Sequence, residues 1–210
     1  MTDPAALPKR GRGRPAGSNG ANTRERILRA ARELFSEVGY HRATFTDIAV
    51  RAAVTRTNVN HYFQSKDELY RTLFEMDKSS VIRAGIADAE EEADLADRVA
   101  AFLRITMQGD FESRASVRLL AASLFDALRN PELGDWAQEQ IDDVRRFIQA
   151  ALDAAVADGK IRQDIDIATV TEILIAMVWG MSMYAGFVGT PGRFEPMVDQ
   201  FADLLHGTLW

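Results

Sequence analysis

The sequence contains no cysteine among its 210 residues. This absence excludes a disulfide framework, a thiolate metal site and a cysteine nucleophile, and it is compatible with a reducing cytoplasm. The three histidines, His41, His61 and His206, are widely spaced and form no H-x-x-x-H pair, so no zinc site is predicted. No Ser-His-Asp arrangement and no phosphate-binding glycine loop can be nominated either. We therefore expect no metal ion, no cofactor and no catalytic residue, and the protein is not expected to be an enzyme.

Long hydrophobic runs are also scarce. The most apolar stretch, residues 173–189, is interrupted by glycine and serine and is preceded by Glu172. It falls short of the roughly 20 apolar residues that a membrane span needs, so a buried helix is the favoured interpretation. The N-terminus lacks the apolar region of a signal peptide. These features predict a cytoplasmic protein that has no membrane partner.

Strand signals are nearly absent, whereas helical periodicity extends along most of the chain. In residues 23–39 the apolar positions recur at intervals of three and four. Asn22 or Thr23 is the candidate N-terminal cap of this helix, and Gly39 is the candidate C-terminal cap.

The remaining helices are shorter at first and longer later in the chain. Thr46 is the candidate cap of a helix at 46–53, and Thr55 is the candidate cap of a helix at 56–62. Further helices are predicted from Lys66 into the 80s and at 97–109, 115–129, 136–159, 168–189 and 195–209. The predicted fold class is therefore all-α, with about nine helices and no sheet.

Charge is distributed unevenly along the chain. Residues 1–71 contain 13 Lys and Arg against 7 Asp and Glu, whereas residues 72–210 contain 12 against 24. The first part therefore carries +6 and the second −12, although the whole chain carries −6. Such an asymmetry predicts that the N-terminal end alone meets a polyanion.

Residues 44–66, TFTDIAVRAAVTRTNVNHYFQSK, have the layout of a helix-turn-helix: a short helix, a break at Ala53–Val54 and a second short helix. Val59 and Phe63 set the buried face of the second helix. Its opposite face is polar and consists of Arg56, Thr57, Asn58, Asn60 and His61. Such side chains suit base edges in a major groove, because Asn can pair with adenine, Arg with guanine, and Thr can contact a thymine methyl. The alternative is the polar face of an ordinary surface helix.

The stretch ILRAARELFSEVGYHRATFTDIAVRAAVTRTNVNHYFQSKDELY, residues 27–70, resembles the DNA-binding domain of the TetR family of bacterial repressors. The resemblance rests on Phe35 to Tyr40, Thr44, Ile48–Ala49, Ala52, Val54–Thr55 and the closing HYFQSKDEL. Residues 157–174 also resemble the turn before the penultimate helix in that family. The resemblance implies an N-terminal three-helix helix-turn-helix domain, residues 22–70, followed by a larger helical ligand-binding and dimerisation domain, residues 71–210.

Two positions depart from the family pattern. Ala53 stands where the family usually has Gly, and the turn should tolerate this if its backbone is not left-handed. Asn60 stands where the family often has Tyr, so operator sequences cannot be taken from relatives. Carried over by position, the resemblance implies DNA contacts at Thr44, Thr46, Arg56, Thr57, Asn58, Asn60, His61, Tyr62 and Lys66. Among these, Thr44, Thr46 and Lys66 would meet phosphates, Tyr62 would meet the backbone or a base edge, and the others would face bases.

A basic arm, residues 1–21, precedes this domain and is predicted to be disordered. Its RGRP core, with Arg12 and Arg14, resembles the AT-hook, an element that lies in narrow A·T-rich minor grooves. The alternative is a solvated tail that only adds nonspecific attraction.

The C-terminal domain is expected to form a homodimer and to bind a small-molecule effector of apolar or amphipathic character. Its last two helices are apolar over more than one stripe, which requires burial on several sides. The predicted dimer interface comprises Val178, Trp179, Phe187, Met197, Phe201, Leu204 and Leu205. The predicted effector pocket mixes apolar bulk with hydroxyl groups and comprises Phe102, Ile105, Thr106, Leu120, Ser123, Leu124, Phe147, Met177, Met181 and Tyr184. Ordinary core packing is the alternative for each pocket residue.

These observations predict a sequence-specific, DNA-binding transcriptional regulator, a repressor that an effector releases from a palindromic operator in double-stranded DNA. The alternative is a helical ligand-carrying or protein-interaction module without sequence-specific DNA binding. Steep salt dependence of duplex binding distinguishes the first from the second.

Overall fold

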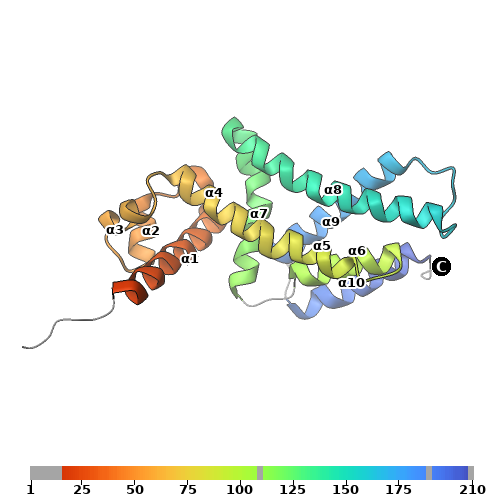
Figure 1. Ribbon diagram of the computed structural model, residues 1–210, viewed down its shortest axis with the longest axis horizontal. Coiled ribbons are helices and arrows are strands. Elements are labelled where there is room, and N and C mark those ends of the chain that lie inside the picture. The colour runs from red at the N-terminus through yellow and green to blue at the C-terminus, as the bar shows by residue number, and fades with distance from the viewer. Residues whose placement is uncertain (1–15, 108–110, 188–190, 208–210) are drawn as a thin grey trace, which may run out of the picture.

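The computed structural model describes residues 16–107, 111–187 and 191–207, and this part of the chain is helical with no strand (Figure 1). Its elements are α1 (Ala16–Arg42), α2 (Phe45–Arg51), α3 (Arg56–Tyr62), α4 (Lys66–Asp77), η1 (Lys78–Arg83), α5 (Ala84–Ala89), α6 (Leu95–Met107), α7 (Phe111–Arg129), η2 (Pro131–Leu133), α8 (Gly134–Ala157), α9 (Ile167–Phe187) and α10 (Pro191–Leu205). α4, the π-helical turn η1 and α5 form one uninterrupted run. Counted once, that run brings the described α-helices to the predicted nine.

The start of α1 differs from the prediction. The helix begins at Ala16, inside the range predicted for the arm, so Asn22 and Thr23 lie within the helix and do not cap it. The early turns lie against the end of α3, since a Cβ at Gly20 would be 3.5 Å from the Tyr62 hydroxyl. Arg12 and Arg14 of the predicted arm lie outside the described residues.

Two capping predictions have different outcomes. Gly39, with φ 77°, ends the regular part of α1, and one further turn continues to Arg42. The predicted cap of the next helix was wrong, because Thr44 and not Thr46 caps α2. Thr44 has an extended backbone, and its hydroxyl accepts the Asp47 N–H at 3.2 Å. One orphan donor of the first turn is thereby satisfied.

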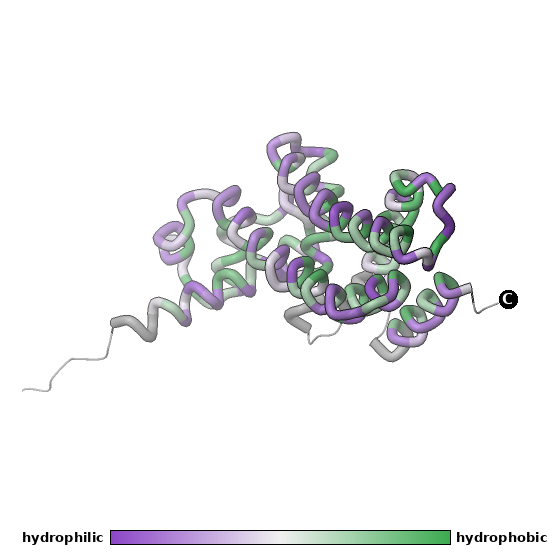
Figure 2. The backbone as a smooth tube through the Cα atoms, turned by 45° about the vertical axis from the view of Figure 1, so that its right-hand side comes forward, coloured by the Kyte–Doolittle hydropathy of each residue, from purple (hydrophilic) through white to green (hydrophobic). Residues whose placement is uncertain are grey.

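The N-terminal end of the molecule has its own core. It is built mainly from α1 to α4, and its largest fully buried side chains include Phe35, Phe63 and Tyr70. Leu119 of α7 and Leu133 of η2 also belong to this core. Hydrophilic and hydrophobic segments alternate along the helices, as expected for amphipathic helices with one buried face (Figure 2). Because α7 and η2 contribute side chains to the N-terminal core, the two halves of the chain are packed together and not merely linked.

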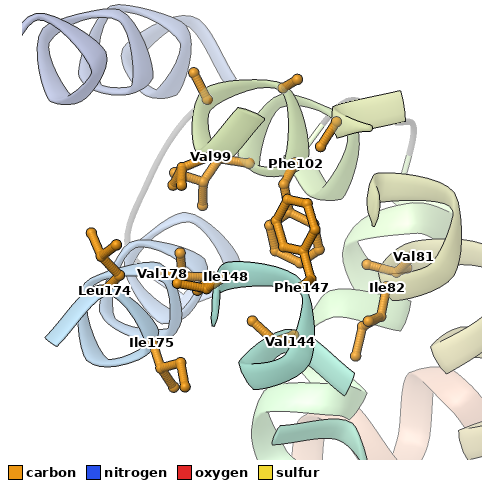
Figure 3. Close-up of a cluster of buried hydrophobic side chains, with 14 of the residues drawn as sticks. Val81, Ile82, Val99, Phe102, Val144, Phe147, Ile148, Leu174, Ile175 and Val178 are labelled. Atoms are coloured by element: carbon orange, nitrogen blue, oxygen red, sulfur yellow. The ribbon is translucent and has the colours of Figure 1, made fainter. Parts of the chain in front are cut away.

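A second core fills the C-terminal half, between η1, α6, α8 and α9 (Figure 3). Phe102 of α6 and Phe147 of α8 meet at its centre with ring centroids 5.7 Å apart. Gly85 of α5 makes this possible, since a Cβ there would come within 2.9 Å of the Phe102 ring. α10 packs along α6, and α9 packs against α7 and α8.

α9 is less buried than the sequence predicts. Residues Ile167–Tyr184 are long and apolar enough to cross a membrane, by length and composition alone, and only 28% of them are buried in the single chain. The face away from α7 and α8 exposes Ile173, Met177 and Tyr184. The apolar periodicity of this helix is thus not explained by packing within one chain.

Candidate nucleic-acid interface and regulatory cavity

α2 and α3 form the predicted helix-turn-helix at one end of the molecule, remote from α10 (Figure 1). Ile48 and Ala49 of α2 and Val59 of α3 are buried, which seats both helices on α1 and α4. Thr55 caps α3 as predicted, because its hydroxyl accepts the Asn58 N–H at 3.1 Å. α3 is thereby held rigidly with one face turned outward.

The turn between the two helices has a left-handed residue. Ala53 has φ 50°, so the condition under which alanine was expected to fit without strain is not met. Arg26 of α1 supports the turn, since its Nη2 donates to the carbonyls of Ala52 at 2.5 Å and Ala53 at 2.7 Å. This role of Arg26 could not be predicted, because Arg26 lies far upstream of the turn and resembles any other helix arginine on the surface.

Replacing Ala53 by glycine is expected to raise the free energy of unfolding by about 0.5–1 kcal/mol. A left-handed backbone costs an L-residue about 1–2 kcal/mol, and the extra flexibility of unfolded glycine offsets about 0.5–1 kcal/mol of the gain. Urea unfolding followed by circular dichroism measures the change. Ala52→Gly is the matched control, because Ala52 has φ −75° and should lose stability instead. Destabilisation by both variants would contradict the strain at Ala53.

The outward face of α3 is polar and free of internal partners. Arg56, Thr57 and Asn60 are exposed and make no hydrogen bond or ion pair with other described residues. His61 is also exposed, and its ring meets the Tyr62 ring edge-on with centroids 5.2 Å apart. These four side chains have the donors and acceptors that base edges require, and no described residue takes up their hydrogen-bonding groups.

Asn58 differs from its neighbours on α3. Its side chain is exposed, but its Oδ1 accepts the Thr55 hydroxyl at 2.5 Å. The amide group therefore completes the cap of α3 and keeps its two N–H donors for another partner. A bidentate contact with adenine would need this oxygen as well, so the predicted base contact of Asn58 competes with capping.

The predicted phosphate contacts also differ from one another. The Thr44 hydroxyl donates to Asp47 at 2.6 Å and is used as a cap, whereas Thr46 is exposed beside it. Lys66 is half-buried, and its Nζ donates to the carbonyls of Tyr40 at 2.8 Å and Ala43 at 3.3 Å. The phosphate contact of Lys66 stays a prediction: in the free chain its ammonium donates to carbonyls around the end of α1 and lies 4.2 Å from the Tyr40 ring centroid. Burial lowers its pKa.

The end of the molecule that carries α2 and α3 is tied to the rest of the chain by buried polar groups that the sequence did not reveal. Arg32 of α1 forms a bidentate contact with Asp77 of α4, with N–O distances of 2.9 to 3.0 Å. Asp126 of α7 accepts the Tyr40 N–H at 3.0 Å and the Tyr70 hydroxyl at 3.3 Å. Burial, together with the Asp126 charge, raises the pKa of Tyr70.

Lys78 follows Asp77 in the sequence and forms ion pairs with α8, in the C-terminal half of the chain. Its side chain is buried, and its Nζ lies 2.9 Å from Glu139 and 3.0 Å from Asp143 of α8. Both contacts are ion pairs. Burial lowers the pKa of this ammonium, but the two carboxylates outweigh burial and raise its pKa above the ordinary value.

The predicted effector pocket is mostly filled by core packing. Phe102 and Leu120 line a cavity of only about 20 Å³ together with Val178, Trp179 and Ser182. Of the other predicted pocket residues, Ser123 is buried and donates to the Leu120 carbonyl, Phe147 is buried, Ile105, Leu124 and Met181 are half-buried, and Met177 and Tyr184 are exposed. The side chain of Thr106 lies outside the described part. The Trp179 Nε1 atom is buried, and no described residue accepts a hydrogen bond from it.

Two of the residues predicted for the dimer interface lie inside the single chain. Val178 belongs to the core of the single chain and Trp179 lines the cavity, so these two assignments are corrected. Their positions on α9 point inward, because α7 and α8 cover that side of the helix. Met197, Phe201 and Leu205 are half-buried, Leu204 is 37% exposed, and the Phe187 side chain lies outside the described part.

One cluster of metal-ligand types lies elsewhere, among Asp94, Asp97 and His206. The His206 ring is 3.7 Å from Asp94 and 3.5 Å from Asp97. The sequence could not reveal this group, because more than a hundred positions separate the histidine from the aspartates. Asp94 already caps α6 by accepting the Ala96 N–H at 2.8 Å. All three side chains are open to solvent, and we assign no ion to them.

Comparison with known proteins matches both halves of the chain. Residues 27–73 match the family profile "Bacterial regulatory proteins, tetR family", and residues 95–209 match "BetI-type transcriptional repressor, C-terminal". The HTH-type transcriptional regulator UidR of Escherichia coli K12 is 26% identical over 159 residues, which cover 76% of this chain and 79% of UidR.

Two solved structures share the fold. A transcriptional regulator from Saccharomonospora viridis in complex with choline has a TM-score of 0.70 at 18% identity, over 87% of this chain and 96% of that chain. FadR from Bacillus subtilis in complex with stearoyl-CoA has a TM-score of 0.68 at 18% identity, over 88% of this chain and 98% of that chain.

Proposed function

The chain belongs to the TetR family of bacterial regulatory proteins and is a helix-turn-helix transcriptional regulator, and we propose that it is a homodimeric repressor that a small-molecule effector releases from a palindromic operator. The observation that carries the proposal is the outward face of α3, where Arg56, Thr57, Asn60 and His61 are exposed on a helix with a buried opposite face. We infer that it works in the bacterial cytoplasm and has no enzymatic activity.

The outer face of α9 supports dimerisation. Ile173, Met177 and Tyr184 are 47%, 40% and 37% exposed and lie on one side of the helix at intervals of four and seven residues. Gly180 lies on the same side, and a Cβ there would meet nothing within 4 Å. This face is therefore apolar, unoccupied and smooth enough for a second helix to approach closely. A two-fold dimer through it would present two α3 helices to successive major grooves.

The buried Trp179 N–H supports a regulatory role for the core around the small cavity, which itself has no room for an effector. An unsatisfied buried donor costs about 1–3 kcal/mol, so an arrangement of the helices that gives this N–H an acceptor would be favoured. Regulation then requires that the ligand bind one arrangement of the dimer better than another, because equal affinity shifts nothing. The choline and stearoyl-CoA held by proteins of similar fold differ widely, so neither identifies the effector of this chain.

Adjacent residues of the α4–α5 run support a route between the two sites. Asp77 is fixed to α1 through Arg32, and Lys78 is fixed to α8 through Glu139 and Asp143. The π-helical turn η1 begins at Lys78, and such turns are often found at functional positions. We propose that α8 movements reach the DNA-binding end along this run.

The arm forms part of the same proposal. Arg12 and Arg14 would enter the minor groove beside the operator, since narrow A·T-rich grooves attract arginine. The alternative, a tail that only adds nonspecific affinity, predicts no preference for A·T flanks.

Selection of bound sites from random duplex DNA tests the proposed function. We expect enrichment of a palindrome with half-sites about one helical turn apart. Affinity for the enriched site should fall steeply with salt, with a log–log slope of about −0.9 for each phosphate neutralised. Flat salt dependence, or selection without a palindrome, would favour the ligand-carrying or protein-interaction alternative.

Replacing His61 by alanine is expected to cost about 1–3 kcal/mol of binding free energy at one base step of the operator. The loss is confined to one base step because the substitution removes only the contact between the His61 ring and the edge of one base. Fluorescence anisotropy with operators substituted at each position measures it. His41→Ala is the control, since His41 is also exposed but lies on the last turn of α1. A loss from His61→Ala that is uniform over all operators would assign this residue to the DNA backbone instead.

A further inference from the structure

An open groove lies outside the second core, between the η1–α5 run, α6 and α8. It has a volume of about 430 Å³. That volume is within the range of small-molecule sites, whereas the inner cavity of about 20 Å³ has room for one water molecule at most. A ligand of ordinary size therefore finds space in the groove without rearrangement of the core.

Arginines from three different elements line this groove. Arg83 of η1, Arg98 of α6 and Arg146 of α8 face Glu90 and Asp143, which leaves one excess positive charge. Asp143 is also paired with Arg146 and with the buried Lys78, so its own charge is well compensated. Arg83 is exposed and has no hydrogen bond or ion pair with other described residues. Its guanidinium is therefore free to bind an anion in bidentate geometry.

The floor of the groove is apolar. Phe147, which is 8% exposed, and the half-buried Ile86 form it, and Ala150 leaves it open on the solvent side. The Phe147 ring also packs against the ring of Phe102, which lines the inner cavity (Figure 3). The Phe147–Phe102 ring contact thus links the groove to the cavity. An apolar chain that pressed on Phe147 would act directly on the cavity.

We infer that the groove binds an amphipathic organic anion. Its carboxylate or phosphate group is held by Arg83 and Arg146, and its alkyl chain lies on Phe147 and Ile86. This inference rests on the proposed function in that it names the chemical class of the effector. It also connects the effector, through Arg146, to the Asp143–Lys78 pair, since Arg146 would be shared between Asp143 and the ligand.

Isothermal titration calorimetry on the full chain tests the inference without DNA. Dodecanoate, kept below its micelle concentration, is the probe, and dodecyl phosphate shows which of the two head groups binds more tightly. Arg83→Ala is expected to weaken dodecanoate binding about 10- to 100-fold, the effect of removing one hydrogen-bonded charge. Arg71→Ala is the matched control, because Arg71 is exposed on the same helical run outside the groove and should leave the affinity unchanged.

Two further arms make the test specific. Ala150→Trp fills the groove from its exposed side and should abolish dodecanoate binding while thermal unfolding stays as in the wild type. Dodecyltrimethylammonium, which has the same chain and the opposite charge, should bind at least about tenfold more weakly than dodecanoate. Equal binding of the two amphiphiles, or equal affinities of Arg83→Ala and Arg71→Ala for dodecanoate, overturns the inference. Operator binding by the ligand-free protein is measured separately, so failure there counts against the proposed function and not against the groove.

Discussion

Replacing Asp77 by alanine is expected to lower the free energy of unfolding by about 3–5 kcal/mol, because it leaves the Arg32 guanidinium buried without its carboxylate. The side chains of Arg32 and Asp77 are 8% and 1% exposed, and their contact is bidentate. Domains of this kind are stable by only about 5–15 kcal/mol in total. Such a loss should lower Tm by roughly 6–20 °C, at about 2–4 °C for each kcal/mol in a chain of this size. Differential scanning calorimetry measures it.

An exposed ion pair on α1, the helix that carries Arg32, offers a matched control. Glu37 of α1 pairs with Arg51 at 2.7 Å, but their side chains are 46% and 33% exposed. The Arg51 hydrogen bond lowers the pKa of Glu37. Solvent screens such a pair, so Glu37→Ala should cost less than about 1 kcal/mol. Equal free energies of unfolding for Asp77→Ala and Glu37→Ala would show that burial does not determine how much an ion pair contributes to stability.

The sequence does not show that the Arg32–Asp77 pair is buried whereas the Glu37–Arg51 pair is exposed. Asp77 and Lys78 stand in a run of polar residues that resembles a solvated helix face, and only the packing of α1 and α8 against that run buries them. Arg32 is 45 positions from Asp77, and Tyr40 is 86 positions from Asp126. Such pairs depend on the three-dimensional arrangement of helices, which the periodicity of each helix does not determine.

Local features were predictable because they depend on neighbouring residues. The buried face formed by Val59 and Phe63 and the Thr55 cap follow from spacing alone, and the structure confirms them. The backbone conformation at Ala53 could not be predicted from this sequence alone, because alanine rarely has a positive φ; the glycine that the family usually has there was the signal for the left-handed φ of 50°.

α9 illustrates a different limit. Its apolar residues predicted burial on several sides, but a sequence does not say whether burial occurs within a chain or between chains. In the single chain α7 and α8 cover the side that carries Val178, while the side with Ile173 and Met177 is left open. The unexplained apolar face is therefore the part of the helix on which a second chain would be expected.

Met177→Glu is accordingly expected to convert the protein into a monomer and to weaken operator binding about 100- to 1,000-fold. In a two-fold interface the substitution places two carboxylates opposite each other in an apolar contact, which costs several kcal/mol, and each 1.4 kcal/mol is about a factor of ten. A monomer also presents one α3 helix to a palindrome that needs two. Analytical ultracentrifugation gives the oligomeric state, and fluorescence anisotropy with the selected operator gives the affinity.

The control for this substitution is Met76→Glu, because Met76 is 42% exposed on α4 and Met177 is 40% exposed on α9. Both variants add the same charge at an exposed methionine, so any general effect of charge on folding or on DNA affinity should be common to them. Only Met177→Glu should change the sedimentation coefficient. A dimeric Met177→Glu variant with wild-type operator affinity would exclude the open face of α9 as the interface, and the burial of that face would then need another partner.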